Sequence, residues 1–238
     1  MTTVMYLVRH GEVAHHRSDV SLTARGRRQA TAAGAAFAAR IIAGDHVRIR
    51  HSPVTRVRET AEILYQQLAD TLAAAGGNEH VLLSPPRPEI ALSNVRFVLA
   101  EEGEPEEPSR LYSTVNQPDF LKSIPPEQAN FYRGFWSSPD PMGYWLTHHS
   151  AGGAEAPEDV LARLQGLVRQ VLGVGAESIG RSFWIMVTHS GAMRVALRAV
   201  FGHDAGEPAF CETIAIAPDD EASRVALSYR GQVAFMSL

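Results

Sequence analysis

Two histidines follow short apolar runs near opposite ends of the chain. His10 lies in the tetrapeptide RHGE at residues 9–12, directly after the apolar run 4–8. His189 occupies the same kind of position, at the end of the apolar run 183–188. A neutral imidazole is a nucleophile, and a guanidinium such as that of Arg9 holds a phosphate with a fork of donors. The pattern therefore predicts one phosphate pocket built from both ends of the chain.

Composition restricts the class of protein. The 238 residues are 45% hydrophobic, which fits a single domain spanning residues 1–238 with a sizeable core. A net charge of -4 gives no reason to expect nucleic acid or a membrane surface as partner. The lone Cys211 excludes an internal disulfide and any multi-cysteine metal site. No apolar run approaches the ~20 residues that span a bilayer, and no signal peptide is recognisable, so we expect a cytoplasmic protein.

Apolar periodicity predicts strands that alternate with helices. The expected strands are residues 4–8, 47–50, 81–83, 183–188, 213–216 and 225–229, and the expected helices are residues 24–42, 53–74, 192–201 and one that begins at Pro157. This alternation predicts a three-layer α/β/α fold around a mostly parallel sheet, with the ligand at the carboxyl ends of the strands. Both histidines fall at such ends.

The segment from about residue 84 to residue 156 has a different composition. It is rich in proline and glutamate, yet it carries many aromatic residues, in which a disordered linker would be poor. We therefore expect an ordered insertion with short helices. It is either a subdomain that packs on itself or a lid that selects a substrate with an apolar or aromatic leaving group. Both roles are compatible.

Four segments, taken in order, resemble one known family. They are RHGE at residues 9–12, LTARGRRQA at residues 22–30, SPVTRVRETA at residues 52–61 and THSG at residues 188–191. In this order they are similar to elements of the histidine phosphatase superfamily, whose members are phosphoglycerate mutase-like proteins and RHG-motif phosphatases. The resemblance covers both flanks of the chain and leaves the middle third unmatched.

The resemblance implies roles for the residues that match. His10 would be the nucleophile and would pass through a phosphohistidine intermediate, while Arg9, Arg56 and His189 would surround the phosphoryl group. Dispersed positive charge of this kind stabilises the transferring phosphoryl oxygens. The alternatives are that His10 and His189 are buried core histidines and that Arg56 is a surface ion-pair residue.

Further phosphate contacts are expected around this set. The amides that open the helix at Ser190 and Gly191 could add donors. His16, where family members often carry asparagine, is a candidate substrate contact. Arg58 points elsewhere on its helix, so we interpret it as structural. We expect no metal and no cofactor, because no carboxylate–histidine spacing supports a metal site.

The general acid has more than one candidate. The resemblance implies a carboxylate after the third strand, and Glu89 lies at about that place, although the Gly-Trp-Glu-Gly-like stretch that should follow is absent. Glu101, Glu102 and Asp140 are the competing candidates. Glu155 is interpreted first as a carboxylate at a pocket rim or helix start.

The expected function is a phosphomonoester phosphatase that acts on a small-molecule phosphate ester, with a homodimer as one possible assembly. A bisphosphoglycerate-dependent mutase is the rival enzyme, but the longer mutase signature after RHGE is missing and the middle third is acidic. A catalytically silent phosphate-binding module is the alternative from another class.

Overall fold

The structure, a computed structural model, describes residues 3–76, 80–99, 104–176, 181–220 and 223–238. In these ranges the strands are β1 (Thr3–Arg9), β2 (His46–His51), β3 (Leu82–Leu83), β4 (Arg87–Pro88), β5 (Ser182–Thr188), β6 (Thr213–Pro218), β7 (Arg224–Tyr229) and β8 (Gln232–Ser237). The helices are α1 (Ala24–Ala38), α2 (Thr55–Ala74), α3 (Pro108–Val115), α4 (Pro118–Ser123), α5 (Pro126–Ser137), α6 (Pro141–His148), α7 (Pro157–Ala176) and α8 (Ser190–Phe201), with 3-10 turns η1 (Ile90–Leu92) and η2 (His149–Ala151).

The described strands form one mixed sheet in the order β3-β2-β5-β1-β6-β7-β8, with β4 also paired to β2. The pairs around β5 and β2 are parallel, whereas β6, β7 and β8 pair antiparallel to their neighbours. In the register of β1 with β5, Arg9 lies opposite Thr188. The residues that follow these two strands, His10 and His189, therefore start from neighbouring points on the same edge of the sheet.

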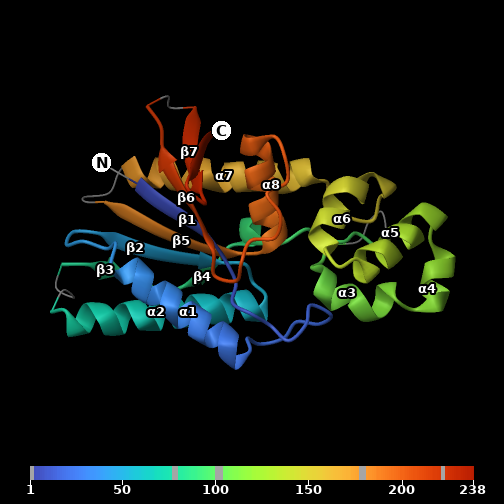
Figure 1. The fold of residues 1–238 in the computed structure, drawn as a ribbon, viewed down its shortest axis with the longest axis horizontal. Helices are drawn as coiled ribbons and strands as arrows, with labels where there is room; N and C mark the ends of the chain where they lie inside the picture. The colour runs from blue at the N-terminus through green and yellow to red at the C-terminus, as the bar shows by residue number, and fades with distance from the viewer. Residues whose placement is uncertain (1–2, 77–79, 100–103, 177–180, 221–222) are drawn as a thin grey trace.

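Helices cover both faces of the sheet, which confirms the predicted three-layer arrangement (Figure 1). Helices α1 and α2 lie on one face, and α7 and α8 lie on the other. Strand β5 is buried along its whole length, as expected for a central strand covered on both sides. None of the described helices is both long and apolar enough to cross a bilayer.

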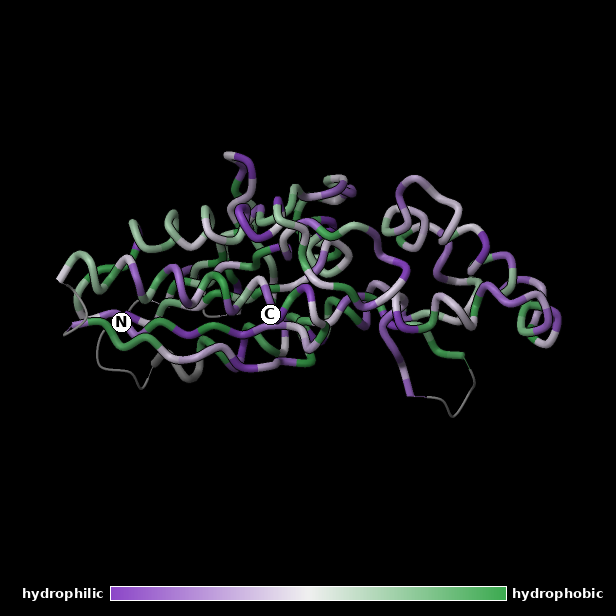
Figure 2. Tube along the Cα trace, turned by 90° about the horizontal axis from the view of Figure 1, so that it is seen from below, coloured by the Kyte–Doolittle hydropathy of each residue, from purple (hydrophilic) through white to green (hydrophobic). Residues whose placement is uncertain are grey.

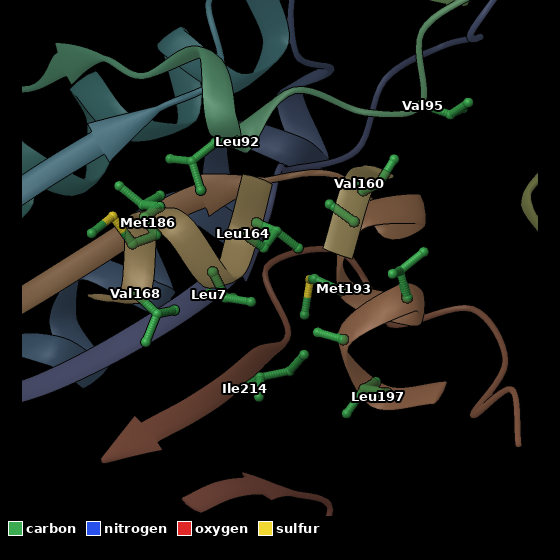
Figure 3. Close-up of a cluster of buried hydrophobic side chains, with 14 of the residues drawn as sticks. Leu7, Leu92, Val95, Val160, Leu164, Val168, Met186, Met193, Leu197 and Ile214 are labelled. Carbon is green, nitrogen blue, oxygen red and sulfur yellow. The ribbon is translucent and has the colours of Figure 1, made fainter. Parts of the chain in front are cut away.

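A large apolar core joins the sheet to α7 and α8 (Figure 3). Leu7 and Met186 project from the strands, Leu164 and Val168 from α7, and Met193 from α8, and all five side chains are nearly fully buried. Apolar residues recur along α7 at helical spacing, which is why this helix was predictable from its sequence. The core fixes α8, and with it the residues that open this helix, against the carboxyl end of β5.

The described part of the insertion is ordered and largely helical, as predicted. Helices α3 to α6 lie together beyond one end of the sheet, and the view from below shows them again at one end of the molecule (Figures 1 and 2). Phe97 is the centre of an aromatic cluster, with ring centroids 5.9 Å from Phe131, 5.1 Å from Tyr132 and 5.0 Å from Phe135. Edge-on and tilted pairs at these distances are favourable, so the insertion packs on itself.

Candidate active site

His10 is held in the turn that directly follows β1. Its backbone N–H donates to the Thr188 carbonyl at 3.0 Å, and its ring Nδ1 lies 2.8 Å from the Gly11 carbonyl oxygen. A carbonyl only accepts, so Nδ1 carries the proton and Nε2 keeps its lone pair. The side chain is 2% exposed. This histidine is therefore both oriented and in the tautomer that a nucleophile requires.

The segments that resemble family motifs hold this turn in place. Thr23 caps α1 and donates its hydroxyl to the Glu12 carboxylate at 2.8 Å, while Gln29 accepts from the Glu12 amide at 3.0 Å. From α2, the Thr60 hydroxyl accepts from the Gly11 amide at 3.0 Å. Polar residues of two other segments, 22–30 and 52–61, thus bind the backbone amides of this turn and its Glu12 carboxylate.

Gly26 sets how closely α1 approaches this turn. A Cβ atom on Gly26 would lie 2.2 Å from the Glu12 carbonyl oxygen, a backbone atom that cannot move without shifting the RHGE turn. We expect Gly26→Ala to destabilise the protein by about 1–3 kcal/mol, as overpacking does elsewhere. Gly166→Ala is the matched control, because its Cβ would meet nothing within 4 Å in α7 and should be neutral or stabilising. Urea unfolding midpoints test the pair, and equal midpoints would contradict this reason for the glycine.

Two buried arginines flank His10. Arg9 ends β1 and Arg56 lies in the first turn of α2, and their side chains are 7% and 2% exposed. Arg56 forms an ion pair with Glu107 at the start of α3, and Arg9 forms one of 2.6 Å with Glu207. In both side chains the buried Nε has no hydrogen-bond partner among the described residues. Buried, unpartnered guanidinium nitrogens indicate room for an anion.

His189, at the end of β5, joins Arg9, His10 and Arg56 in one group of four side chains, the phosphate constellation. Its ring centroid lies 5.5 Å from that of His10, and its Nδ1 lies 3.4 Å from Nη2 of Arg56. Since an arginine nitrogen only donates, Nδ1 accepts and Nε2 carries the proton toward the Ser52 hydroxyl at 2.9 Å. Ser52, which lies two residues before Val54, the N-cap of α2, holds this imidazole.

Burial keeps both imidazoles neutral. Desolvation is the largest cause that lowers the pKa of His10 well below its usual value, and the charge of Arg56 lowers it further. The pKa of His189 is lowered in the same way, first by burial and then by Arg56. Both rings are 2% exposed or less. A neutral ring leaves Nε2 of His10 free to attack at pH values where a free histidine would be partly protonated.

These shifted pKa values predict how stability depends on pH. The folded-state pKa lies below the unfolded value of about 6.5, so below that pH the unfolded chain binds more protons and the folded state loses stability. Above it, the contribution is fully present. We expect the free energy of unfolding to fall between pH 7.5 and 5.5, by up to about 1.4 kcal/mol per pH unit for each imidazole.

Urea unfolding at several pH values measures this slope. His10→Asn should make the dependence shallower, whereas His203→Asn, at an exposed position, should leave it unchanged. Equal slopes in the wild type and the His10→Asn variant would refute the buried neutral imidazole.

The constellation lines a pocket of about 200 Å³. Its described lining residues are Arg9, His10, His16, Arg56, Asn94, Glu107, Pro108, Ser109, Phe135, Trp136, Pro139, Asp140, Pro141, Met142, His189, Ser190 and Glu207. His16 lies at the exposed rim with its ring centroid 5.7 Å from that of His10. Ser190 opens α8 but donates its hydroxyl to Glu207, and Gly191 lies just behind the lining. The insertion supplies the aromatic wall.

The candidate acids are placed differently. Glu89 is not among the described lining residues, and its carboxylate instead caps η1 by accepting from the Ala91 amide at 3.0 Å. Glu101 and Glu102 lie outside the described residues. Asp140 does line the pocket, but bonds from Arg194 lower its pKa. The structure thus gives the assignment of the acid to Glu89 no support.

Glu155 is a structural residue in the described part of the chain. Its carboxylate accepts from the Arg96 amide at 2.9 Å and from the Arg96 guanidinium at 2.5 Å, and it lies 3.3 Å from Arg163. Arg163 in turn donates to the Asn94 carbonyl at 2.6 Å. The group fixes the course of the chain from η1 into the pocket.

Sequence reasoning missed three charged or amide side chains of the pocket. Glu107 lies in the acidic stretch of the insertion, Glu207 in the loop after α8, and Asn94 just after η1. A glutamate before Pro108 at a helix start was a detectable capping signal for Glu107, which accepts from the Ser109 amide at 2.9 Å. Glu207 and Asn94 carry no such local signal.

Comparisons with known proteins indicate a family for part of the chain and a fold for the whole. Residues 5–74 match the model of the histidine phosphatase superfamily (branch 1). No curated protein sequence matches the chain. Among solved structures, YhfR of Bacillus stearothermophilus has a TM-score of 0.55 at 19% identity and covers 97% of each chain.

Two further solved structures show the same fold. A phosphoglycerate mutase from Bacillus anthracis has a TM-score of 0.58 at 16% identity, covering 97% of this chain and 93% of its own. The mycobacterial glucosyl-3-phosphoglycerate phosphatase Rv2419c in complex with VO3 has a TM-score of 0.54 at 17% identity, covering 95% and 97%.

The mixed sheet, its helical layers and these likenesses define a phosphoglycerate mutase-like α/β fold. The match over residues 5–74 confirms the resemblance to the histidine phosphatase superfamily for the part of the chain that holds the first three of the four motifs.

Proposed function

We propose that this protein is a phosphomonoester phosphatase that works through a phosphohistidine on His10. The observation that carries the proposal is the free Nε2 of His10 between two buried arginines, each with an unpartnered Nε among the described residues. A phosphoryl group bound there would meet a nucleophile on one side and guanidinium donors around its equatorial oxygens. These are the requirements of phosphoryl transfer.

The reaction would take place in two steps. In the first, Nε2 of His10 forms a bond to phosphorus while the ester P–O bond breaks and its electron pair leaves with the oxygen. Arg9 and Arg56 would donate to the equatorial oxygens, and His189 would join them by turning its Nε2–H from Ser52 to the phosphoryl group. In the second, water attacks the phosphohistidine, and inorganic phosphate and a free imidazole are regenerated. The Gly11 carbonyl, bonded to Nδ1, would stabilise the positive ring that exists between the steps.

The charges of the pocket favour a phosphatase over a mutase. A mutase must also hold a second phosphate, yet the remaining charged lining residues described are Glu107, Asp140 and Glu207. These carboxylates would repel a second phosphate. The solved neighbours include both a phosphatase and a mutase, so the fold alone does not distinguish the two activities.

The test is an assay of purified protein with 4-nitrophenyl phosphate, in which inorganic phosphate and nitrophenol are both measured. We expect equal amounts of the two products, with vanadate as a competitive inhibitor. Phosphoryl transfer to 3-phosphoglycerate with little free phosphate would instead favour the mutase. Vanadate binding without any turnover would favour a silent phosphate-binding module.

A further inference from the structure

Each carboxylate among the described lining residues is bound to arginine. Glu107 pairs with Arg56, and Glu207 lies 2.6 Å from Arg9 and 3.3 Å from Arg194. Asp140 accepts two bonds from Arg194, of 2.5 and 2.9 Å. Ser109 and Ser190 donate to the second oxygens of Glu107 and Glu207, so both oxygens of each carboxylate already accept hydrogen bonds. In the described part of the pocket, no carboxylate oxygen is without a donor.

The segment after the third strand, where a general acid was expected, contributes an amide side chain to the pocket. Between Arg56 and Glu107, Asn94 is the one described residue that lines the pocket. It is 8% exposed, and its buried Oδ1 has no hydrogen-bond partner in the described residues. Its backbone carbonyl is held by Arg163, so its position is fixed. A carboxamide has no acidic proton, although it can donate a hydrogen bond to an oxygen that carries negative charge.

Asn94 is packed against the start of α8, beside the phosphate constellation. A Cβ atom on Gly191 would lie 2.4 Å from Asn94 Oδ1 and 2.8 Å from Met142 Sδ. Gly191 follows His189 by two residues, so Asn94 and Met142 lie next to the histidine end of the pocket. The glycine makes room for an amide and a thioether where a larger residue would displace both.

The remaining wall is apolar and aromatic. Phe135, Trp136 and Met142 line the pocket together with three prolines. Trp136 also has a buried indole Nε1 without a partner in the described residues. A volume of about 200 Å³ is small beside the roughly 300–1,000 Å³ of sites for drug-sized ligands. The space beyond the phosphate fits a small, flat, largely apolar group. One polar atom on that group could pair with the Trp136 indole N–H.

Resting on the phosphatase function proposed above, we propose that the substrates are phosphate esters of phenols, whose leaving oxygen departs without a proton from the protein. The P–O bond breaks with its electron pair on oxygen, the Nε2–P bond forms, and the phenolate later takes its proton from water. Asn94 is the catalytic residue that donates a hydrogen bond from Nδ2 to the departing oxygen. Phe135, Trp136 and Met142 contact the aromatic ring.

The test compares kcat/KM for 4-nitrophenyl, phenyl and ethyl phosphate, because kcat/KM reports the step in which the P–O bond breaks. Without a general acid, the rate should fall steeply as the leaving group becomes more basic. We expect ethyl phosphate to be slower than 4-nitrophenyl phosphate by more than the ~10²–10⁴ that a general acid would recover. Comparable values for the two esters would overturn the proposal.

The variant Asn94→Glu places a carboxyl at the same point. We expect it to raise ethyl phosphate turnover relative to 4-nitrophenyl phosphate by about 10-fold or more, while Asn94→Gln, which keeps an amide, leaves the ratio unchanged. Vanadate binding checks that both variants keep the pocket, and the wild-type series decides the proposal even if a variant fails to fold. A selective loss with ethyl phosphate in Glu107→Gln or Glu207→Gln would assign the acid there and refute it. If 4-nitrophenyl phosphate is not turned over at all, the phosphatase function itself fails, and the substrate class with it.

Discussion

Replacing His10 with alanine is expected to lower kcat for 4-nitrophenyl phosphate by about 10⁴–10⁶-fold, the scale seen when a covalent nucleophile is removed. The reason is that Nε2 of His10 is the free nitrogen of the buried constellation, with its partner Nδ1 already bonded to Gly11. A brief exposure to a ³²P-labelled ester followed by denaturation should trap label that is stable to alkali and lost in acid. The variant should trap none.

His15→Ala is the matched control, because His15 is exposed in the loop that follows and does not line the pocket described. It should keep both the turnover and the label. Full labelling of the His10→Ala variant would assign the nucleophile to another residue. Retained vanadate binding in that variant would show that the loss lies in the chemistry and that the pocket is intact.

The second large effect is expected at Arg56. Arg56→Ala should lower kcat/KM by about 10³-fold, because removing one preorganised donor to a developing oxyanion costs about 10²–10³. Arg56→Lys should recover only part of the loss, since an ammonium lacks the guanidinium fork. Arg58→Ala is the control on the same helix, because Arg58 is 57% exposed and should be neutral. An unchanged kcat/KM in Arg56→Ala would remove this arginine from the site.

Stability must be separated from catalysis in this experiment. Arg56→Ala leaves the buried Glu107 carboxylate without its cation, which typically costs 3–5 kcal/mol. Adding Glu107→Gln in the same chain removes the unpaired charge. We expect the double variant to regain stability but not activity, which a purely structural role for Arg56 would not produce.

The residues of the site that could be predicted are those that follow local sequence patterns, such as apolar runs, turns and helix caps. Apolar runs placed His10 and His189 at strand ends, and the parallel pairing of β1 with β5 brings them together. The turn and capping residues of the four motifs were predictable because each acts on backbone only a few residues away or on one neighbouring turn. The glycine at position 26 had a stated place in a motif, but its reason, close approach to Glu12, needed coordinates.

The rest depended on long-range packing. Glu107 and Glu207 reach the pocket from loops whose course is set by the packing of the insertion and of α8. We predicted Glu89 as the general acid because it follows the third strand. In the structure its carboxylate instead caps η1 by accepting from the Ala91 amide. Strand β8 was also missed, because Val233 and Phe235 are exposed at the sheet edge and follow a tight turn in which Arg230 and Gly231 both have positive φ.

The pairing of β1 with β5 has a consequence for how activity first arises. The proposed phosphate site can form only after segments from opposite ends of the chain have paired in register, which requires contacts at very large sequence separation. Such contacts form late, after the cost of closing a long loop has been met. Enzymatic activity should therefore return with the slowest phase of refolding, after the helical circular dichroism signal. A chain released from synthesis before β5 would hold the nucleophile but not the pocket.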